Sequence, residues 1–184
     1  MVNIIGYVVR GEYICIPIYP QVEFLDNDFK RTKITYIVYF DGACEPVNPG
    51  GTASYGAVIF YKGKQVWQCS KVYGRGKGMS NNVAEYAGFI TVLNWFAEQE
   101  LFDAEIRILG DSKLVIQQMF GSWKIKDGLY APLAQNARER LSQFKKVTGE
   151  WVPRDLNDIA DKLSKDALKQ AGVKLMIQPE RGAK

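Results

Sequence analysis

Three strand-like runs follow one another along the chain before any helix is expected. Residues 35–40, 55–61 and 65–73 are rich in β-branched and aromatic side chains, and Lys62-Gly63-Lys64 has the composition of a tight hairpin turn. We therefore predict an antiparallel meander here, with Asp41 at the end of the first strand. Helical and strand-like segments alternate after the meander, which indicates a mixed sheet flanked by helices in the α/β class.

The alternating part begins with a long amphipathic helix. Apolar residues recur at helical spacing from Val83 to Ala97, and Ser80 or Asn81 can cap the first turn. The remaining predicted elements are strands at 105–109 and 147–152 and helices at 113–120, 129–144 and 156–171.

The two ends differ in composition from this central part. The apolar runs at residues 4–9 and 13–18 indicate a hairpin, and a polar connector follows them, so we interpret residues 1–33 as an N-terminal appendage. Residues 34–171 form the expected main domain, and 172–184 a tail. At 184 residues, the chain is long enough to bury one substantial core.

Composition narrows the chemistry. The chain has no histidine, and its three cysteines, Cys15, Cys44 and Cys69, lie far apart, so a zinc site is not expected. We interpret the cysteines as core fillers in a reducing compartment and expect a cytoplasmic protein with no secretory signal and no membrane span. The formal charge of +4 is compatible with a nucleic-acid partner without demonstrating one.

Acidic residues stand next to apolar segments at four places, namely Asp41, Glu85, Asp111 and Asp161. Carboxylates are rarely buried unless they are paired or bind a cation, so we predict a divalent metal site. Simpler explanations exist for single residues: a turn at Asp41, a favourable helix dipole at Glu85, and a helix cap at Asp111-Ser112.

The last helix offers several acids for the fourth position. Asp155 suits the N-cap, whereas Asp158 and Asp161 are three residues apart and share a face. We favour Asp161 because of its Ala160-Asp161 context and its distance from Pro153.

In their order along the chain, these motifs resemble ribonuclease H type 1 over residues 35–168. The matching stretches are Asp41-Gly42-Ala43-Cys44 with Asn48-Pro49-Gly50-Gly51, Ser80-Asn81-Asn82 before Glu85, Asp111-Ser112, and Val152-Pro153-Arg154 with Asn157 and Ala160-Asp161. The resemblance implies a five-stranded mixed sheet in which three antiparallel strands are followed by parallel ones. It also places this chain with the compact archaeal-like and bacterial branch that lacks a basic protrusion.

The same resemblance implies an activity. Asp41, Glu85, Asp111 and Asp161 would hold two Mg²⁺ or Mn²⁺ ions, and the protein would be an endonuclease that hydrolyses the RNA strand of RNA/DNA hybrids, leaving 3′-hydroxyl and 5′-phosphate ends. Two divalent ions suit this chemistry because they activate a water and neutralise a leaving oxygen at neutral pH.

Substrate contacts are expected from two groups of residues. Asparagine and glutamine amides can both donate to and accept from a sugar or base edge, and helix N-termini bind phosphates. The candidates of these kinds are Asn48, Ser80, Asn81, Asn82 and Gln117. Lys113, Trp123, Lys124 and Arg154 would contact the backbone or stack. Turn and cap chemistry, or a solvated helix edge, would produce the same pattern.

One departure from the family pattern concerns a loop histidine that assists many relatives. Trp151 aligns with that position, so its role is missing or passes to the metal ions, a substrate phosphate or Arg154. We expect a slower, metal-dependent enzyme without an imidazole titration. A DNA nuclease on the same fold and a non-catalytic module that binds hybrids or double-stranded RNA are the alternatives.

Overall fold

The computed structural model describes residues 6–9, 12–15 and 35–176. The chain divides into two compact units, Met1–Thr32 and Lys33–Lys184. In the first unit, β1 (Gly6–Val9) and β2 (Glu12–Cys15) pair antiparallel as a hairpin. The expected connector, with Pro17, Pro20 and the polar residues 26–33, lies outside the described residues. Of the expected tail, residues 172–176 are described.

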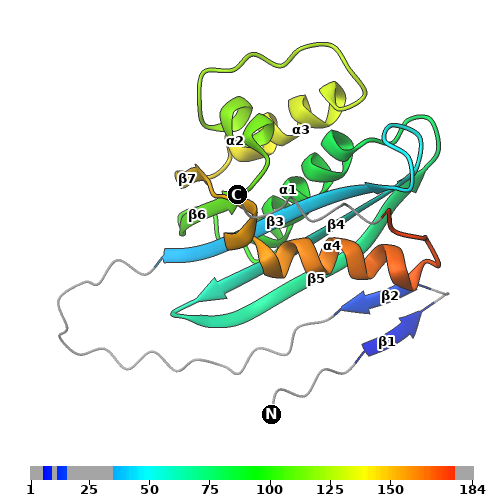
Figure 1. The fold of residues 1–184 in the computed structure, drawn as a ribbon. Helices are drawn as coiled ribbons and strands as arrows, with labels where there is room; N and C mark the ends of the chain where they lie inside the picture. Colours follow the sequence, from blue (N-terminus) through cyan, green and yellow to red (C-terminus); the bar gives the residue numbers. More distant parts are fainter. Residues whose placement is uncertain (1–5, 10–11, 16–34, 177–184) are drawn as a thin grey trace, which may run out of the picture. The chain divides into compact units, whose positions relative to one another are not determined.

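The second unit is built on a five-stranded mixed sheet (Figure 1). The strands are β3 (Thr35–Glu45), β4 (Thr52–Tyr61), β5 (Lys64–Arg75), β6 (Glu105–Gly110) and β7 (Lys146–Trp151), in the spatial order β5-β4-β3-β6-β7. The first three pair antiparallel, and β6 pairs parallel to both β3 and β7. The predicted mixed sheet, with three antiparallel strands followed by parallel ones, is confirmed.

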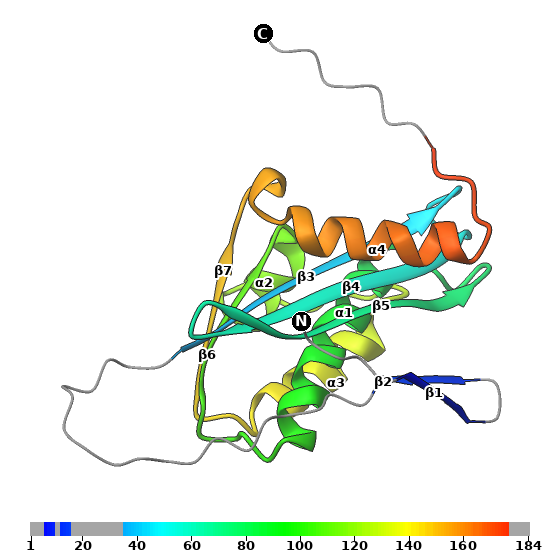
Figure 2. The ribbon, with the colours of Figure 1, turned by 90° about the horizontal axis from the view of Figure 1, so that it is seen from below.

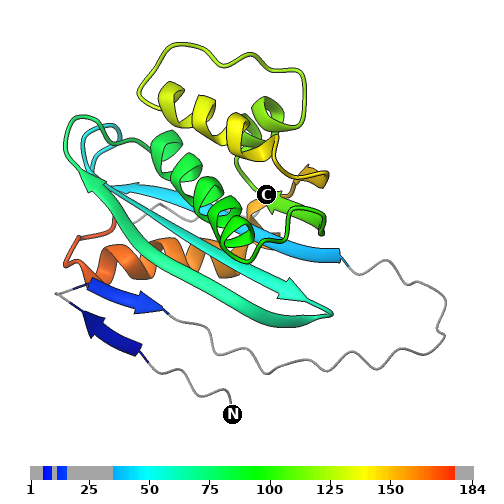
Figure 3. The same cartoon turned by 180° about the vertical axis from the view of Figure 1, so that it is seen from behind.

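Helices cover both faces of this sheet. They are α1 (Asn81–Glu98), α2 (Lys113–Met119), α3 (Ala131–Leu141) and α4 (Asp158–Gln170), with a short 3₁₀ turn at Arg154–Leu156. Figure 2 shows α4 on one face and α1 on the other, and in Figure 3 α1 crosses the strands while α3 packs beside it. In the described part of the chain, no helix has the length and apolar character needed to cross a bilayer.

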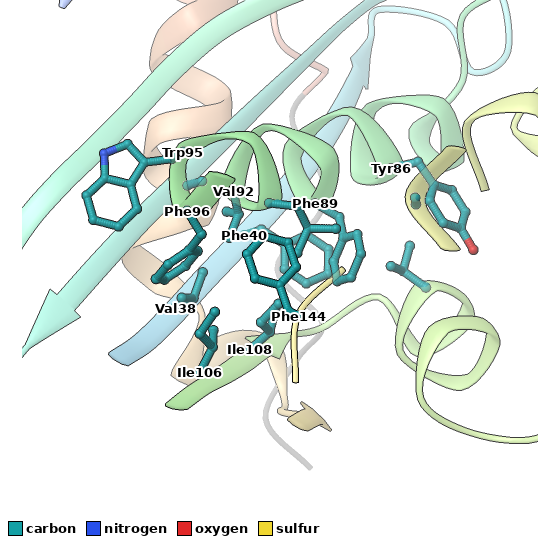
Figure 4. Packing of buried hydrophobic residues seen from close by; sticks show 14 of the residues in the cluster. Val38, Phe40, Tyr86, Phe89, Val92, Trp95, Phe96, Ile106, Ile108 and Phe144 are labelled. Carbon is teal, nitrogen blue, oxygen red and sulfur yellow. The ribbon is translucent and has the colours of Figure 1, made fainter. Parts of the chain in front are cut away.

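The main core lies between the sheet and α1 (Figure 4). Side chains of β3 and β6 interleave with those of α1, and the rings of Phe40 and Phe89 meet edge to face with centroids 5.5 Å apart. Fully burying one such side chain stabilises the fold by about 1.5–3 kcal/mol. The stability gained from burying many such side chains can offset the cost of burying polar groups at the edge of the core.

The first strand is longer than predicted. We expected it to end at Phe40, but β3 continues to Glu45 because its pairing with β4 continues to the pair Glu45 and Thr52. Its parallel pairing with β6, in contrast, stops at Phe40 and Gly110. The prediction that Asp41 ends a strand is therefore wrong, although Asp41 does lie just beyond the parallel ladder.

The last helix begins later than predicted. Asp155 lies in the 3₁₀ turn, in which the Leu156 N–H donates to the carbonyl of Pro153 at 2.9 Å, so it cannot cap α4. Asn157 occupies the cap position instead. The expectation that Asp155 is the N-cap is wrong because the chain makes an extra tight turn before the helix starts.

Candidate active site

Three carboxylates from three different elements meet at one edge of the sheet. Asp41 comes from β3, Glu85 from the second turn of α1, and Asp111 directly follows β6. Each offers one oxygen, and these oxygens all lie within 4.8 Å of one another. Because Phe40 and Gly110 are partners in the parallel ladder, the next residue of each strand emerges at the same edge.

The approach of α1 depends on Gly42. A Cβ atom at this position would lie 2.2 Å from the backbone nitrogen of Glu85, so any other residue would push the helix away. Ser80 secures the helix start, since its Oγ accepts a hydrogen bond from the Val83 N–H at 3.3 Å. The expected cap at Ser80 is present, and it fixes the turn of α1 that carries Glu85.

The cluster is electrostatically unfavourable in the absence of a cation. Burial raises the pKa of Asp41 to about 7, and Asp111 and Asp161 add to that effect, whereas the Ser164 hydroxyl opposes it. Burial, followed by the charges of Asp41 and Asp111, raises the pKa of Glu85 well above its ordinary value. Among the described residues, the buried Oε2 of Glu85 has no hydrogen-bond partner.

Asp161 lies on α4 and is not one of the three clustered acids. It forms ion pairs with Arg154 and, at 2.6 Å, with Lys165. Burial acts to raise its pKa, but the hydrogen bonds from Lys165 and Arg154 outweigh burial and lower it. Asp158 is exposed, and its Oδ1 accepts a hydrogen bond from the Ile159 N–H at 2.8 Å.

The polar candidates beside Glu85 form a linked surface. Asn48, in the turn after β3, accepts a hydrogen bond from the Asn81 N–H at 3.0 Å. This bond ties the turn to the N-terminus of α1, and the side chains of Asn48, Asn81 and Asn82 are exposed there. These asparagines therefore contribute to the turn and the helix start, and their side-chain amides are still accessible to a ligand.

The candidates after Asp111 lie on α2 and on the loop that follows it. Lys113 is the first residue of α2, and Trp123 and Lys124 are exposed on the loop. The Trp123 N–H donates to the carbonyl of Gln117 at 3.1 Å. Gln118, which we did not predict, anchors the same loop from inside through a 2.9 Å bond to the carbonyl of Lys124.

Three further residues form hydrogen bonds with the clustered acids, a role that was not predicted for them. Trp151 is 47% exposed, and its Nε1–H donates to the carbonyl of Asp111 at 3.0 Å. Asn157 and Ser164 are buried and hydrogen-bond to the carboxylates of Asp111 and Asp41. The sequence had singled out Trp151 only as the residue at the loop histidine position and Asn157 only as part of the last motif, and nothing marked Ser164.

Comparison with known proteins places this arrangement in a family. The model of the family described as "Reverse transcriptase-like" matches residues 39–167. Among curated proteins, Ribonuclease HI of Halobacterium salinarum is 36% identical over 133 residues, which cover 72% of this chain and 64% of that protein. The Bifunctional protein Rv2228c of Mycobacterium tuberculosis is 40% identical over 124 residues, or 67% of this chain and 33% of that protein. The chain thus spans a third of the mycobacterial relative and less than two thirds of the halobacterial one.

Solved structures agree with this placement. The N-terminal RNase H domain of Rv2228c from M. tuberculosis superposes with a TM-score of 0.63 and 36% identity, over 72% of this chain and 98% of that chain. RNase H1 from the archaeon H. salinarum gives a TM-score of 0.64 and 33% identity, over 74% and 98%. LC11-RNase H1 in complex with an RNA/DNA hybrid gives 0.62 and 30%, again over 74% and 98%.

Fold, acid cluster and relatives together define the class of protein, a domain with a ribonuclease H-like sheet. The chain belongs to the ribonuclease H type 1 family, as its sequence motifs predicted.

Proposed function

We propose that this chain is an endoribonuclease that hydrolyses the RNA strand of RNA/DNA hybrids and leaves 3′-hydroxyl and 5′-phosphate ends, with residues 34–171 as the catalytic domain. The observation that carries the proposal is the meeting of carboxylate oxygens from Asp41, Glu85 and Asp111 within 4.8 Å. A structure of a relative, LC11-RNase H1, holds an RNA/DNA hybrid, which supports the choice of substrate.

The residues present suit a pair of Mg²⁺ or Mn²⁺ ions. All the donors are carboxylate oxygens, which hard cations prefer, and within the described ranges the buried Glu85 Oε2 has no other partner. Asp41, Glu85 and Asp111 would hold the ions, with Asp161 as the fourth ligand once substrate is bound. Such ions lower the pKa of an attacking water and neutralise charge on the leaving oxygen.

Arg154 is a cationic side chain bonded to one of the candidate acids. Its Nε–H donates to Oδ1 of Asp161 at 3.0 Å, and its charge lowers the pKa of Asp41 and of Glu85. A guanidinium binds phosphate oxygens through two parallel N–H groups. We propose that Arg154 contacts a substrate phosphate. The chain has no histidine that could take part instead.

Two groups of residues would orient the substrate, one around the start of α1 and one that follows Asp111 in the sequence. Asn48, Asn81 and Asn82 offer donors and acceptors for the 2′-hydroxyls and base edges that distinguish RNA from DNA, and Ser80 lies with them at the start of α1. In the second group, Gln117 is a further amide, while Lys113, Trp123 and Lys124 suit backbone contacts and stacking.

The cysteines bear on where the activity would operate. Cys44 is a buried free thiol in the structure. A thiol of this kind persists in reducing compartments, so we propose a cytoplasmic location.

A cleavage assay with three labelled substrates tests the proposal. An RNA/DNA hybrid, a DNA duplex and an RNA duplex are each incubated with Mg²⁺, Mn²⁺ or a chelator, and the ends of the products are mapped. We expect metal-dependent cleavage of the RNA strand in the hybrid. Cleavage of DNA alone would instead establish a DNA nuclease, and tight hybrid binding without cleavage in either metal would establish a binding module.

A further inference from the structure

Helix α4 brings two buried polar side chains to the acid cluster from the face of the sheet opposite α1. Asn157, at the helix cap, is 1% exposed, and Ser164, in the middle of the helix, is 0% exposed. Burying a polar group is costly unless its hydrogen bonds are made, so the partners of these side chains show what the groups do.

Asn157 connects two strand ends. Its Nδ2 donates to the carbonyl of Phe40 at 2.9 Å and to Oδ1 of Asp111 at 2.7 Å. Both partners are acceptors, so the amide must present its NH₂ group, and both of its N–H bonds are used. The bond to Asp111 holds one oxygen of that carboxylate and so fixes the orientation of the group.

Helix capping does not explain Asn157. A capping asparagine turns its oxygen towards the first N–H groups of the helix, but here the side chain makes no such bond. Among the described residues, its buried Oδ1 has no hydrogen-bond partner. The side chain therefore forgoes its local role in favour of the contacts with β3 and Asp111.

Ser164 plays the corresponding part for Asp41. Its Oγ lies 2.5 Å from Oδ2 of Asp41 and 2.8 Å from the carbonyl oxygen of Asp161. A hydroxyl has one hydrogen to donate, and the shorter contact is to the carboxylate. Asp41 thus has one oxygen held by α4, as Asp111 does.

The helix itself is fixed against the sheet by contacts that do not involve the acids. A Cβ atom at Gly56 of β4 would lie 2.4 Å from the carbonyl oxygen of Ala160, so the helix backbone rests directly on the strand. The hydroxyls of Ser54 and Ser70 each donate at 2.7 Å to α4 carbonyls, those of Ser164 and Leu163. These contacts give Asn157 and Ser164 a rigid base.

We propose that Asn157 and Ser164 are positioning residues that orient the carboxylates of Asp111 and Asp41 for a divalent cation. This inference rests on the metal site of the proposed function. Groups that orient metal ligands in this way are worth about 10- to 100-fold in metal affinity or activity when they are removed.

Mn²⁺ binding to the full chain without nucleic acid tests the inference. Free Mn²⁺ is measured by its electron paramagnetic resonance signal for the parent, Ser164→Ala, Asn157→Leu and the control Ser70→Ala, which loses a serine bond to α4 that does not reach an acid. Chemical unfolding of each variant confirms folding, and Ser164→Ala, which removes one oxygen, decides the test if Asn157→Leu does not fold.

We expect Ser164→Ala and Asn157→Leu each to weaken Mn²⁺ binding about tenfold or more and to raise the Mn²⁺ concentration for half-maximal hybrid cleavage, with Ser70→Ala close to the parent. Folded variants that bind Mn²⁺ like the parent would overturn the inference alone, as would an equal loss in Ser70→Ala, since a loosened helix would then be the cause. A parent that binds no Mn²⁺ would overturn the proposed metal site and the inference with it.

Discussion

The acids at this edge of the sheet fall into two groups with opposite surroundings. Asp41 and Glu85 are crowded by burial and by other carboxylates, and both have raised pKa values. Asp161, nearby on α4, is bonded to Arg154 and Lys165 and has a lowered pKa. The protein pairs Asp161 directly with its own cations, whereas the charge of Arg154 only partly offsets the effect of burial on Asp41 and Glu85. The cluster is therefore the part of the site that needs an external cation.

Removing a clustered carboxylate should have the largest effect. We expect Asp41→Asn to lower hybrid cleavage by about 1,000-fold or more, because the amide keeps the shape but loses the charge that holds a cation. Cleavage of a labelled hybrid under single-turnover conditions measures this. Activity within tenfold of the parent would show that the cluster is not the catalytic centre.

The cluster should also make metal-free stability depend on pH. An acid whose pKa rises from 3.8 to about 7 on folding binds its proton more tightly in the folded state, so stability falls as pH increases from about 4 to about 7. For Asp41 this amounts to at most about 4 kcal/mol.

Urea unfolding with chelator, at pH 5 and pH 8, measures that dependence. We expect the parent to lose more stability than Asp41→Asn between the two pH values, and saturating Mn²⁺ to restore it at pH 8. Equal losses in the two proteins would mean that Asp41 is not strained by burial.

Asp161 should matter less than the clustered acids because it already has partners. We expect Asp161→Asn to reduce cleavage by about 10- to 100-fold, and the exposed Asp158→Asn, as its control, to leave the rate near that of the parent. Steady-state rates at several Mg²⁺ concentrations compare them. The reverse ranking would assign the fourth ligand to Asp158.

The smallest effect should come from Trp151, which supports Asp111 through its backbone. Trp151→Phe removes the Nε1–H bond to the Asp111 carbonyl, and a single hydrogen bond contributes about 1 kcal/mol, so we expect a loss of roughly fivefold in cleavage. An unchanged rate would mean that the bond from the Trp151 indole to Asp111 does not contribute to cleavage.

The fold was largely predictable because hydrophobic periodicity and turn composition mark each strand and helix of the second unit. The meeting of Asp41, Glu85 and Asp111 also followed from the resemblance, since each stands in a motif of the ribonuclease H type 1 pattern. The continuation of β3 past Phe40 could not be predicted, because it depends on pairing with β4 across a turn rather than on local composition.

The supporting contacts were beyond prediction for a similar reason. Nothing in the sequence separates Ser164 from a solvent-exposed helix serine; only the packing of α4 on Gly56 buries it against Asp41. The pairing of Asp161 with Arg154 likewise depends on the extra turn before α4, whereas Lys165 is the i+4 neighbour of Asp161 on the helix itself.

Anomalous diffraction from crystals of the full chain grown with Mn²⁺ tests the central claim most directly. We predict a manganese peak bounded by the carboxylates of Asp41, Glu85 and Asp111, absent in Asp41→Asn crystals grown in the same way. Protein that cleaves a hybrid in Mn²⁺, but whose crystals show no manganese peak among these three residues, would contradict the claim.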